Sequence, residues 1–284
     1  MPDECVAVVG GTPFNFAFIN IAKVLPAWNS YGTSPTLKGH AWSALITRAL
    51  SRNFALFSPD PVPTALSPAL SRITTTPGAG DPRMPYPLVA FRPYCAAEPP
   101  IFGLLALHLR RGDYAEHCAN LAFWGSEYNV WNKFGNTSLP NPDPKSAYPL
   151  LPDHLSVPAG MSRHNASYAH CWPTPDAVLV KVRAVRAEAA AAGQKFSTVY
   201  MATNGEAVWV GEIADRLRAE GWALVGSSLD MQLARDEQAV SQAVDMGVLV
   251  AAETFIGNGF SSVTSNVVQL RLAGGRHVNT NRFW

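Results

Sequence analysis

The chain has 284 residues, 48% of them hydrophobic and 15% charged, and its formal net charge is +1. This length and apolar content suffice for one large domain or two smaller ones with a buried core. The sequence has no dense run of Lys and Arg, which excludes the clustered basic face that nucleic-acid binding requires. It also has no apolar run long enough to span a bilayer, so we expect these residues to make no membrane contact.

The first hundred residues are typical of an incomplete lobe followed by a linker. Residues 38–56 carry the one apolar pattern in this region that predicts a helix. Eleven of the 23 prolines then fall within residues 59–100, and proline disfavours helix both at its own position and in the preceding residue. We therefore predict a partial N-terminal lobe with a Pro-rich linker over residues 1–100, and a second domain over residues 101–284.

Strand and helix patterns alternate from residue 101 onward. Short apolar segments predict strands over residues 101–108, 196–203, 222–225 and 254–256. Amphipathic patterns with capping residues predict helices over residues 175–193, 206–220, 236–253 and 261–272. A polar insertion rich in Trp, Pro and Asn interrupts the alternation over about residues 115–172. Repeated strand–helix units predict an α/β fold with a parallel sheet that helices cover on both faces.

Three polar segments follow predicted strands directly, at residues 108–113, 203–205 and 257–262. The carboxyl ends of parallel strands meet at one edge of the sheet, and ligands of such sheets bind beyond that edge. We call it the carboxyl edge. The convergence of three polar segments there predicts a ligand-binding site.

The residue types at the carboxyl edge suit a diphosphate. A guanidinium from Arg110 or Arg111 could hold a phosphate through two hydrogen bonds, or could pair with Asp113 as a structural ion pair. The segment Gly257–Ser262 leads into a helix whose first free amides favour an anion, although Ser261 or Ser262 could instead serve only as the helix cap. The combination of an arginine with this loop indicates a diphosphate site.

Motifs of several other sites are absent from the sequence. It contains no Gly-x-x-x-x-Gly-Lys-Ser/Thr phosphate loop, no Gly-x-Ser-x-Gly elbow and no His-Glu-x-x-His. It also contains no Asp-x-Asp pair that would hold a divalent cation, so we predict no metal. The Arg-Gly-Asp tripeptide at 111–113 leaves a buried strand instead of a protruding loop, which disfavours a role in adhesion.

The insertion carries cysteines and aromatic residues whose roles the sequence leaves open. Cys118 and Cys171 either form a disulfide in an oxidising compartment or remain two buried thiols. Two glycosylation sequons in loop-like sequence begin at Asn136 and Asn165 and favour a secretory compartment. Four aromatic side chains either form a small core of the insertion or contact sugars: Trp124, Tyr128, Trp131 and Phe134.

Two of these segments resemble motifs of one enzyme family. Residues 108–113 (His-Leu-Arg-Arg-Gly-Asp) resemble the His-x-Arg-Arg-type motif of the protein O-fucosyltransferases. Residues 255–264 (Phe-Ile-Gly-Asn-Gly-Phe-Ser-Ser-Val-Thr) resemble the C-terminal Phe-Ile-Gly-Asn-x-x-Ser-Ser-x-Thr motif of that family. Asp245 and Arg271 lie at offsets from it that are similar to the family's. Residues 198–204 are similar to a middle strand that often ends in Ala-Thr-Asp. The resemblance covers about residues 101–284.

The resemblance implies a GT-B-like architecture of two Rossmann-like lobes, with GDP-fucose held mainly by the C-terminal one and no other cofactor. It implies metal-independent, inverting transfer of fucose to a hydroxyl of a protein or glycan acceptor. Arg110 would contact the β-phosphate and stabilise the leaving GDP as charge builds on the diphosphate. The remaining predicted donor contacts are Ser261 and Ser262 at phosphate, His108 and Asp245 at the guanine–ribose end, Arg271 as a supporting basic residue, and Arg111, Gly257 and Asn258.

The sequence departs from the family in its first hundred residues. Residues 10–15 (Gly-Gly-Thr-Pro-Phe-Asn) match poorly the glycine- and asparagine-rich donor loop of the first lobe. No general base is evident, and Asp113 is the candidate. One alternative is therefore a non-catalytic nucleotide-sugar- or carbohydrate-binding relative. A second is a protein using another sugar nucleotide, because guanine selectivity rests on Asp245 and His108 alone. We expect the lumen of the endoplasmic reticulum or Golgi, with any membrane anchor outside these residues.

Overall fold

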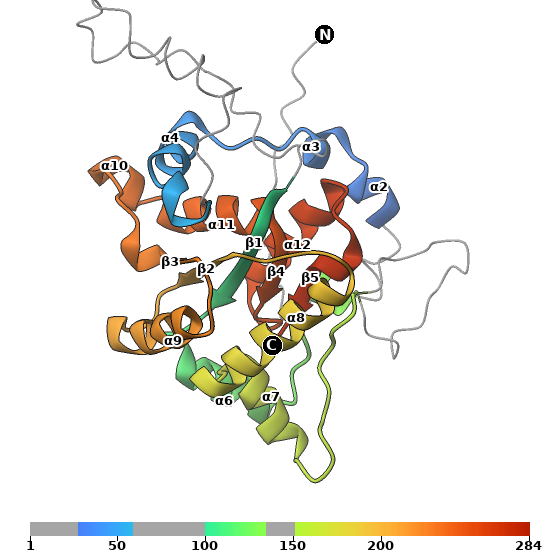
Figure 1. The fold of residues 1–284 in the computed structure, drawn as a ribbon. Helices are drawn as coiled ribbons and strands as arrows, with labels where there is room; N and C mark the ends of the chain where they lie inside the picture. Colours follow the sequence, from blue (N-terminus) through green and yellow to red (C-terminus); the bar gives the residue numbers. More distant parts are fainter. Residues whose placement is uncertain (1–27, 59–99, 135–150) are drawn as a thin grey trace, which may run out of the picture.

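The computed structural model describes residues 28–58, 100–134 and 151–284 (Figure 1). Several sequence-based predictions lie outside the described residues: the glycine-rich segment 10–15, the Pro-rich linker over 59–99, and the sequon at Asn136.

Five parallel strands form one sheet in the order β3-β2-β1-β4-β5, with β1 at its centre (Figure 1). This confirms the α/β fold with a Rossmann-like parallel sheet. The short last strand, whose sequence Asn-Arg-Phe has no apolar run, is not predicted by the pattern. The strands are β1 Ile101–Leu109, β2 Thr198–Thr203, β3 Leu224–Ser227, β4 Ala252–Gly257 and β5 Asn281–Phe283.

Helices cover both faces of the sheet, and no described helix is long and apolar enough to cross a membrane. The α-helices are α2 Trp28–Gly32, α3 Pro35–Lys38, α4 Ala44–Arg52, α6 Tyr114–Phe123, α7 Arg163–Cys171, α8 Pro175–Ala191, α9 Ala207–Ala219, α10 Arg235–Gln238, α11 Ser241–Ala251 and α12 Ser262–Ala273. Short 3-10 turns are η2 Phe54–Leu56, η3 Val130–Lys133, η4 Ser228–Asp230 and η5 Val278–Thr280.

Side-chain alternation along β1 divides the core in two. Leu104 and Ala106 belong to one buried cluster with α4, α11 and α12, whereas Leu105 and Leu107 belong to the other with α8 and α9. Successive residues of a strand point to opposite faces, so each face of β1 receives every second apolar side chain. The same alternation decides where the polar residues after β1 point.

Capping residues mark one end of each of three helices at the positions that the sequence predicts. Thr174 accepts a hydrogen bond from the N–H of Ala177 and opens α8, and Pro175 follows as its first residue. Helix α9 ends before Gly221, whose φ of 80° is a conformation that glycine adopts at little cost. Ser261 caps α12 by accepting from the N–H of Val263.

Some predicted boundaries are wrong. The single helix over 38–56 begins later and is divided into α4 and the 3-10 turn η2, because Ser43 caps α4 and Asn53 ends it. The helix over 236–253 is likewise divided into α10 and α11, and its last two residues belong to β4. The strand over 222–225 lies two residues later, and the insertion contains α6 and α7. Asn165, expected in a loop, lies exposed in the first turn of α7.

The described part of the predicted N-terminal lobe packs onto the sheet instead of forming a core of its own. Ile46 and Phe57 share one buried cluster with Leu104 of β1. The side-chain amide of Asn53 pairs with the backbone of Gln232, donating to its carbonyl at 3.0 Å and accepting from its N–H at 2.7 Å. Residues 28–58 are therefore tied to the segment that follows β3.

A disulfide joins Cys118 of α6 to Cys171 of α7, which lie side by side (Figure 1). Of the four aromatic residues of the insertion, Tyr128, Trp131 and Phe134 are buried in the main core cluster that includes Leu104 of β1, and they do not form a separate small core of the insertion. Trp124 differs, because 66% of it is exposed. The insertion is therefore built into the fold at its two described ends.

Candidate functional site

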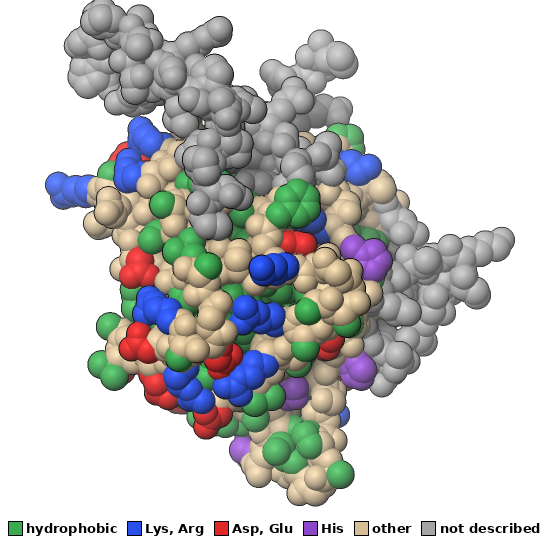
Figure 2. Space-filling view, in the orientation of Figure 1, with side chains coloured by type: hydrophobic (Ala, Val, Ile, Leu, Met, Phe, Trp, Pro, Cys, Tyr) green, Lys and Arg blue, Asp and Glu red, His purple; other side chains and the backbone are tan. Residues whose placement is uncertain are grey.

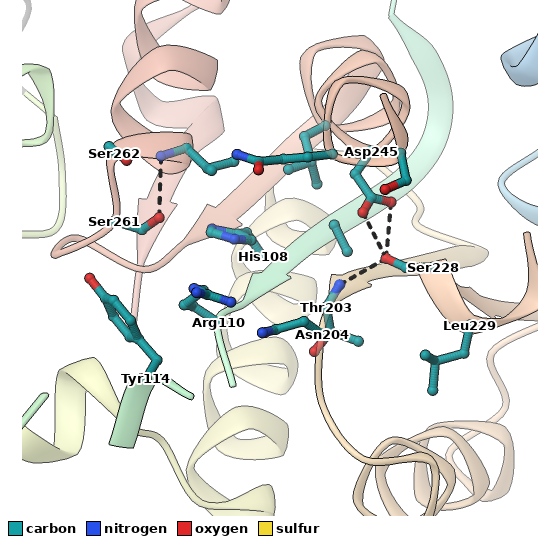
Figure 3. Close-up of a pocket in the computed structure, with 15 residues that line it drawn as sticks. His108, Arg110, Tyr114, Thr203, Asn204, Ser228, Leu229, Asp245, Ser261 and Ser262 are labelled. Atoms are coloured by element: carbon teal, nitrogen blue, oxygen red, sulfur yellow. Dashed lines mark hydrogen bonds between the residues drawn. The ribbon is translucent and has the colours of Figure 1, made fainter. Parts of the chain in front are cut away.

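A cavity of about 600 Å³ opens at the carboxyl edge, between the ends of β1 and β2 and the helices α11 and α12 (Figure 3). Its volume lies within the range of small-molecule sites, and its position is the one where parallel α/β sheets bind ligands. The lining residues are His108, Arg110, Tyr114, Ala202, Thr203, Asn204, Ser228, Leu229, Ser241, Gln242, Asp245, Leu249, Ser261, Ser262 and Val263.

One end of the cavity combines Arg110 with the N-terminus of α12. The guanidinium of Arg110 is 5.1 Å from the ring centre of Tyr114 and pairs with Asp113 across 2.9 Å. Ser261 and Ser262 begin α12 on the same side of the cavity (Figure 3). The first amides of a helix lack intrahelical partners and carry partial positive charge. This end therefore attracts an anion.

The other end of the cavity holds a buried carboxylate. Asp245 of α11 accepts hydrogen bonds from the hydroxyl of Tyr200 at 2.7 Å and from that of Ser228 at 2.9 Å. Burial raises the pKa of Asp245 to about 6, although both hydrogen bonds oppose the shift. The carboxylate is therefore ionised at neutral pH and can accept further hydrogen bonds from a ligand, as the edge of a nucleobase would offer.

His108 lies between the two ends and is buried (Figure 3). Its Nδ1 is 2.8 Å from the hydroxyl of Thr264 in α12. Burial, followed by the charge of Arg110, lowers the pKa of His108 to about 4. The imidazole is therefore neutral at pH 7 and contributes a hydrogen-bonding group to the cavity without adding charge.

Arg110 and Arg111 point to opposite faces of the sheet, as side-chain alternation requires. Arg111 does not line the cavity; its guanidinium lies between two indole rings, 3.7 Å from the centre of Trp172 and 4.1 Å from that of Trp209. It also donates to the carbonyl of Pro173 at 3.2 Å. Through these cation–π contacts Arg111 stabilises the packing of the carboxyl edge against Trp172 and Trp209.

Three more predicted site residues lie outside the cavity lining. Asp113 is paired with Arg110, and 80% of its side chain is exposed. Asn258 is fully buried and donates to the carbonyl of Cys171 at 2.7 Å, which ties its loop to the disulfide. A Cβ at Gly257 would lie 2.3 Å from the Cγ2 of Thr264, so only glycine permits this close packing of β4 against α12.

Arg271 is also absent from the cavity lining and is completely buried. Its guanidinium donates to the backbone carbonyls where α11 passes into β4 without a turn, those of Leu249, Val250, Ala252 and Glu253. The remaining contacts are to Thr280 and Asn281. Arg271 therefore joins α12 to the end of α11, the two helices that supply Ser261 and Asp245.

The segment 203–205, which the sequence predicts at the carboxyl edge, supplies Thr203 and Asn204 to the cavity, although neither is among the predicted site residues. Tyr200, which holds Asp245, lies on the cavity side of β2, and alternation from the apolar residues of that strand could have placed it. The cavity residues from the segment after β3 and from α6 were not predicted. Ser228 belongs to η4, whose sequence carries no motif, and Tyr114 to a helix hidden in the insertion. Among the described residues, no group of three or more His, Cys, Asp or Glu could hold a metal ion.

The fold and the cavity define an α/β protein with a Rossmann-like sheet and a cavity at its carboxyl edge. No protein-family model and no curated protein matches the sequence. Solved structures with similar folds include POFUT1 in complex with GDP-fucose (14% identity, TM-score 0.42, covering 66% of this chain and 42% of that chain) and POFUT1 in complex with GDP (13% identity, TM-score 0.41, covering 65% and 43%). This chain thus matches less than half of the length of those chains.

Proposed function

We propose that the cavity binds a nucleotide sugar, GDP-fucose, and that the protein transfers its fucose to a hydroxyl of a protein or glycan. The observation that carries the proposal is the pairing of Arg110 and the α12 N-terminus at one end with the ionised Asp245 at the other. The first end suits a diphosphate and the second suits the N–H groups of guanine. The motif resemblance of residues 108–113 and 255–264 supports fucose as the transferred sugar.

The proposed reaction breaks the bond between the anomeric carbon of fucose and the β-phosphate oxygen. The acceptor oxygen attacks from the opposite face, which inverts the configuration, and its proton passes to a base. Arg110 and the amides at the start of α12 stabilise the charge that develops on the leaving diphosphate, without a metal ion. These groups are fixed by the fold before the reaction, so little reorganisation opposes them.

Binding without transfer is the second candidate, and one observation favours it. Asp245 is the one carboxylate among the described residues that line the cavity, and Tyr200 and Ser228 already hold it. Asp113 points into solvent and pairs with Arg110. A general base would therefore have to come from outside the described cavity lining. A fucose-transfer assay separates the two candidates once donor binding is measured.

Replacing Arg110 by alanine is expected to weaken GDP binding by about 10- to 100-fold, because charge-assisted hydrogen bonds to phosphate are worth about 1.5–3 kcal/mol. Isothermal titration with GDP, GDP-fucose and UDP measures this effect, and wild-type protein should bind both guanine nucleotides more tightly than UDP. Arg218→Ala is the matched control, since Arg218 lies on α9 and does not line the cavity. Equal GDP affinity in both variants would contradict the proposed diphosphate site.

The affinity for GDP-fucose is expected to fall by up to about tenfold between pH 7 and pH 5. Asp245 must be ionised to accept from guanine, and its pKa of about 6 means that it becomes protonated in this range. The diphosphate of a nucleotide sugar has no ionisation there, so the ligand stays constant. The affinity of Asp245→Asn should be low and nearly independent of pH, and an unchanged pH dependence in this variant would contradict the assignment.

The titration of Asp245 is followed through ligand affinity, because its effect on the free energy of unfolding is masked by that of His108. A carboxyl whose pKa is raised in the folded state makes the fold less stable as pH rises from about 4 to about 6. His108, whose pKa is lowered to about 4, makes the fold more stable as pH rises from about 4 to about 6.5. The two effects oppose one another over the same range.

We also propose the secretory lumen as the location of the protein. Disulfides persist in oxidising compartments, and the bond between Cys118 and Cys171 supports this proposal. Figure 2 presents positive and negative side chains interspersed on one face of the molecule, which suits a glycan or protein acceptor better than a polyanion.

A further inference from the structure

The side-chain amide of Asn204 is fixed by the chain while its donor stays free. The N–H of Arg111 donates to Oδ1 of Asn204 at 2.8 Å. An N–H can only donate, so this bond identifies the oxygen branch of the amide and assigns the other branch as Nδ2. Nδ2 has no hydrogen-bond partner within the described part of the chain. The position of Nδ2 depends on a glycine at residue 112, because a Cβ on Gly112 would lie 2.7 Å from Nδ2.

Asn204 lies on the cavity side of the sheet, beyond the end of β2. Tyr200 and Ala202 point to the face covered by α11 and α12, and alternation continues this direction to Asn204. Asn204 lines the cavity, and in Figure 3 it lies between Arg110 on one side and Ser228 and Leu229 on the other. Its free donor therefore belongs to the site and not to the core.

The strand order arranges the polar groups of the cavity in a row. Ser228, bound to Asp245, follows β3; Asn204 follows β2; Arg110 follows β1; and Ser261 follows β4. Neighbouring strands are about 4.8 Å apart, so this row spans about 14 Å, comparable with an extended nucleoside diphosphate. If the base lies at Asp245 and the phosphates lie at Arg110 and α12, the ribose lies opposite Asn204.

We propose that Nδ2 of Asn204 donates a hydrogen bond to a ribose hydroxyl of the bound nucleotide and thereby selects ribonucleotides. This inference rests on the proposed function, which supplies the nucleotide. A neutral amide donor matches a neutral hydroxyl, whereas the anionic phosphates have a guanidinium and a helix N-terminus at the other end of the row. Asn204 is a binding residue that determines specificity, because a nucleotide without ribose hydroxyls leaves its donor unpaired.

The test compares two ligands in three proteins. Wild-type protein, Asn204→Ala and Asn204→Asp are titrated with GDP and with 2′,3′-dideoxy-GDP, which lacks both ribose hydroxyls. The wild type should bind dideoxy-GDP at least about fivefold more weakly than GDP, the value of one neutral hydrogen bond. In Asn204→Ala this ratio should fall by about fivefold. A general disturbance of the edge weakens both ligands alike and leaves the ratio unchanged, so the ratio isolates the contact.

Asn204→Asp distinguishes ribose from phosphate as the partner. A carboxylate still accepts from the N–H of Arg111 and can accept from a ribose hydroxyl, so GDP affinity should change by less than about fivefold. A loss of more than tenfold would place a phosphate against this residue and overturn the ribose assignment. An unchanged ligand ratio in Asn204→Ala would overturn it too. Wild-type protein that binds neither ligand would overturn the proposed function, and this inference with it.

Discussion

Replacing Arg271 by methionine is expected to lower the free energy of unfolding by about 3–5 kcal/mol, because several buried neutral acceptors lose a charged donor, at about 1–3 kcal/mol each. The guanidinium is fully buried, and all three of its nitrogens donate hydrogen bonds. Methionine fills most of the volume but removes the donor that Arg271 supplies to four backbone carbonyls near the end of α11. Unsatisfied buried carbonyls are costly because water cannot reach them.

Urea unfolding of the two proteins measures this loss. Arg218→Met is the matched control, because the side chain of Arg218 is 54% exposed and its ion pair with Asp215 lies at the surface. Arg271→Lys should also be destabilised, since an ammonium keeps the charge but cannot reach acceptors on several sides as a planar guanidinium does. A loss below about 1 kcal/mol in Arg271→Met would mean that the carbonyls find other donors.

Removing the disulfide through the double substitution Cys118→Ala and Cys171→Ala is expected to lower the free energy of unfolding by about 4 kcal/mol. The two cysteines are 53 residues apart, and closing a loop of that length restricts the unfolded chain by about this amount. The disulfide also supports the site, because the carbonyl of Cys171 accepts from Asn258 in the loop that leads to α12. We therefore expect GDP affinity to fall as well.

The comparison is best made in a chain whose other two cysteines, Cys5 and Cys95, are replaced by serine, so that one disulfide alone can form. Chemical unfolding of this protein with and without a reductant then gives the contribution of the bond directly, without any substitution at the disulfide itself. If both forms unfold at the same urea concentration, the loop-closure argument fails. Unchanged GDP affinity after reduction would instead show that the disulfide does not support the site.

The central strands of the sheet could be predicted from the sequence because most of their residues are buried on both faces. A segment such as residues 104–107 must be apolar throughout, and Thr174 with Pro175 marks the start of α8 through local chemistry. The break between α11 and β4 could not be predicted in this way. No glycine ends that helix, and the group that satisfies its last carbonyls is Arg271, about twenty residues further along the chain.

The candidate site could be predicted in part. Segments that follow buried strands converge by topology, and this correctly brings His108, Arg110 and Ser261 to one cavity. The motif alone could not separate Arg110 from Arg111, because the choice depends on which face each side chain points to. Ser228 and Tyr114 could not be predicted as site residues for another reason. Ser228 lies in a 3-10 turn and Tyr114 in a helix of the insertion, and neither segment has a periodic apolar pattern.

The row of polar groups at the carboxyl edge belongs to adjacent strands of a single sheet and to the two helices that Arg271 joins. These groups cannot move apart without breaking strand pairing. A nucleotide bound as proposed would therefore meet them already in place, and within the described part of the chain no hinge has to close before these contacts form. Association should follow single-exponential kinetics whose rate rises in proportion to nucleotide concentration and falls with added salt, since the anionic ligand is attracted to Arg110.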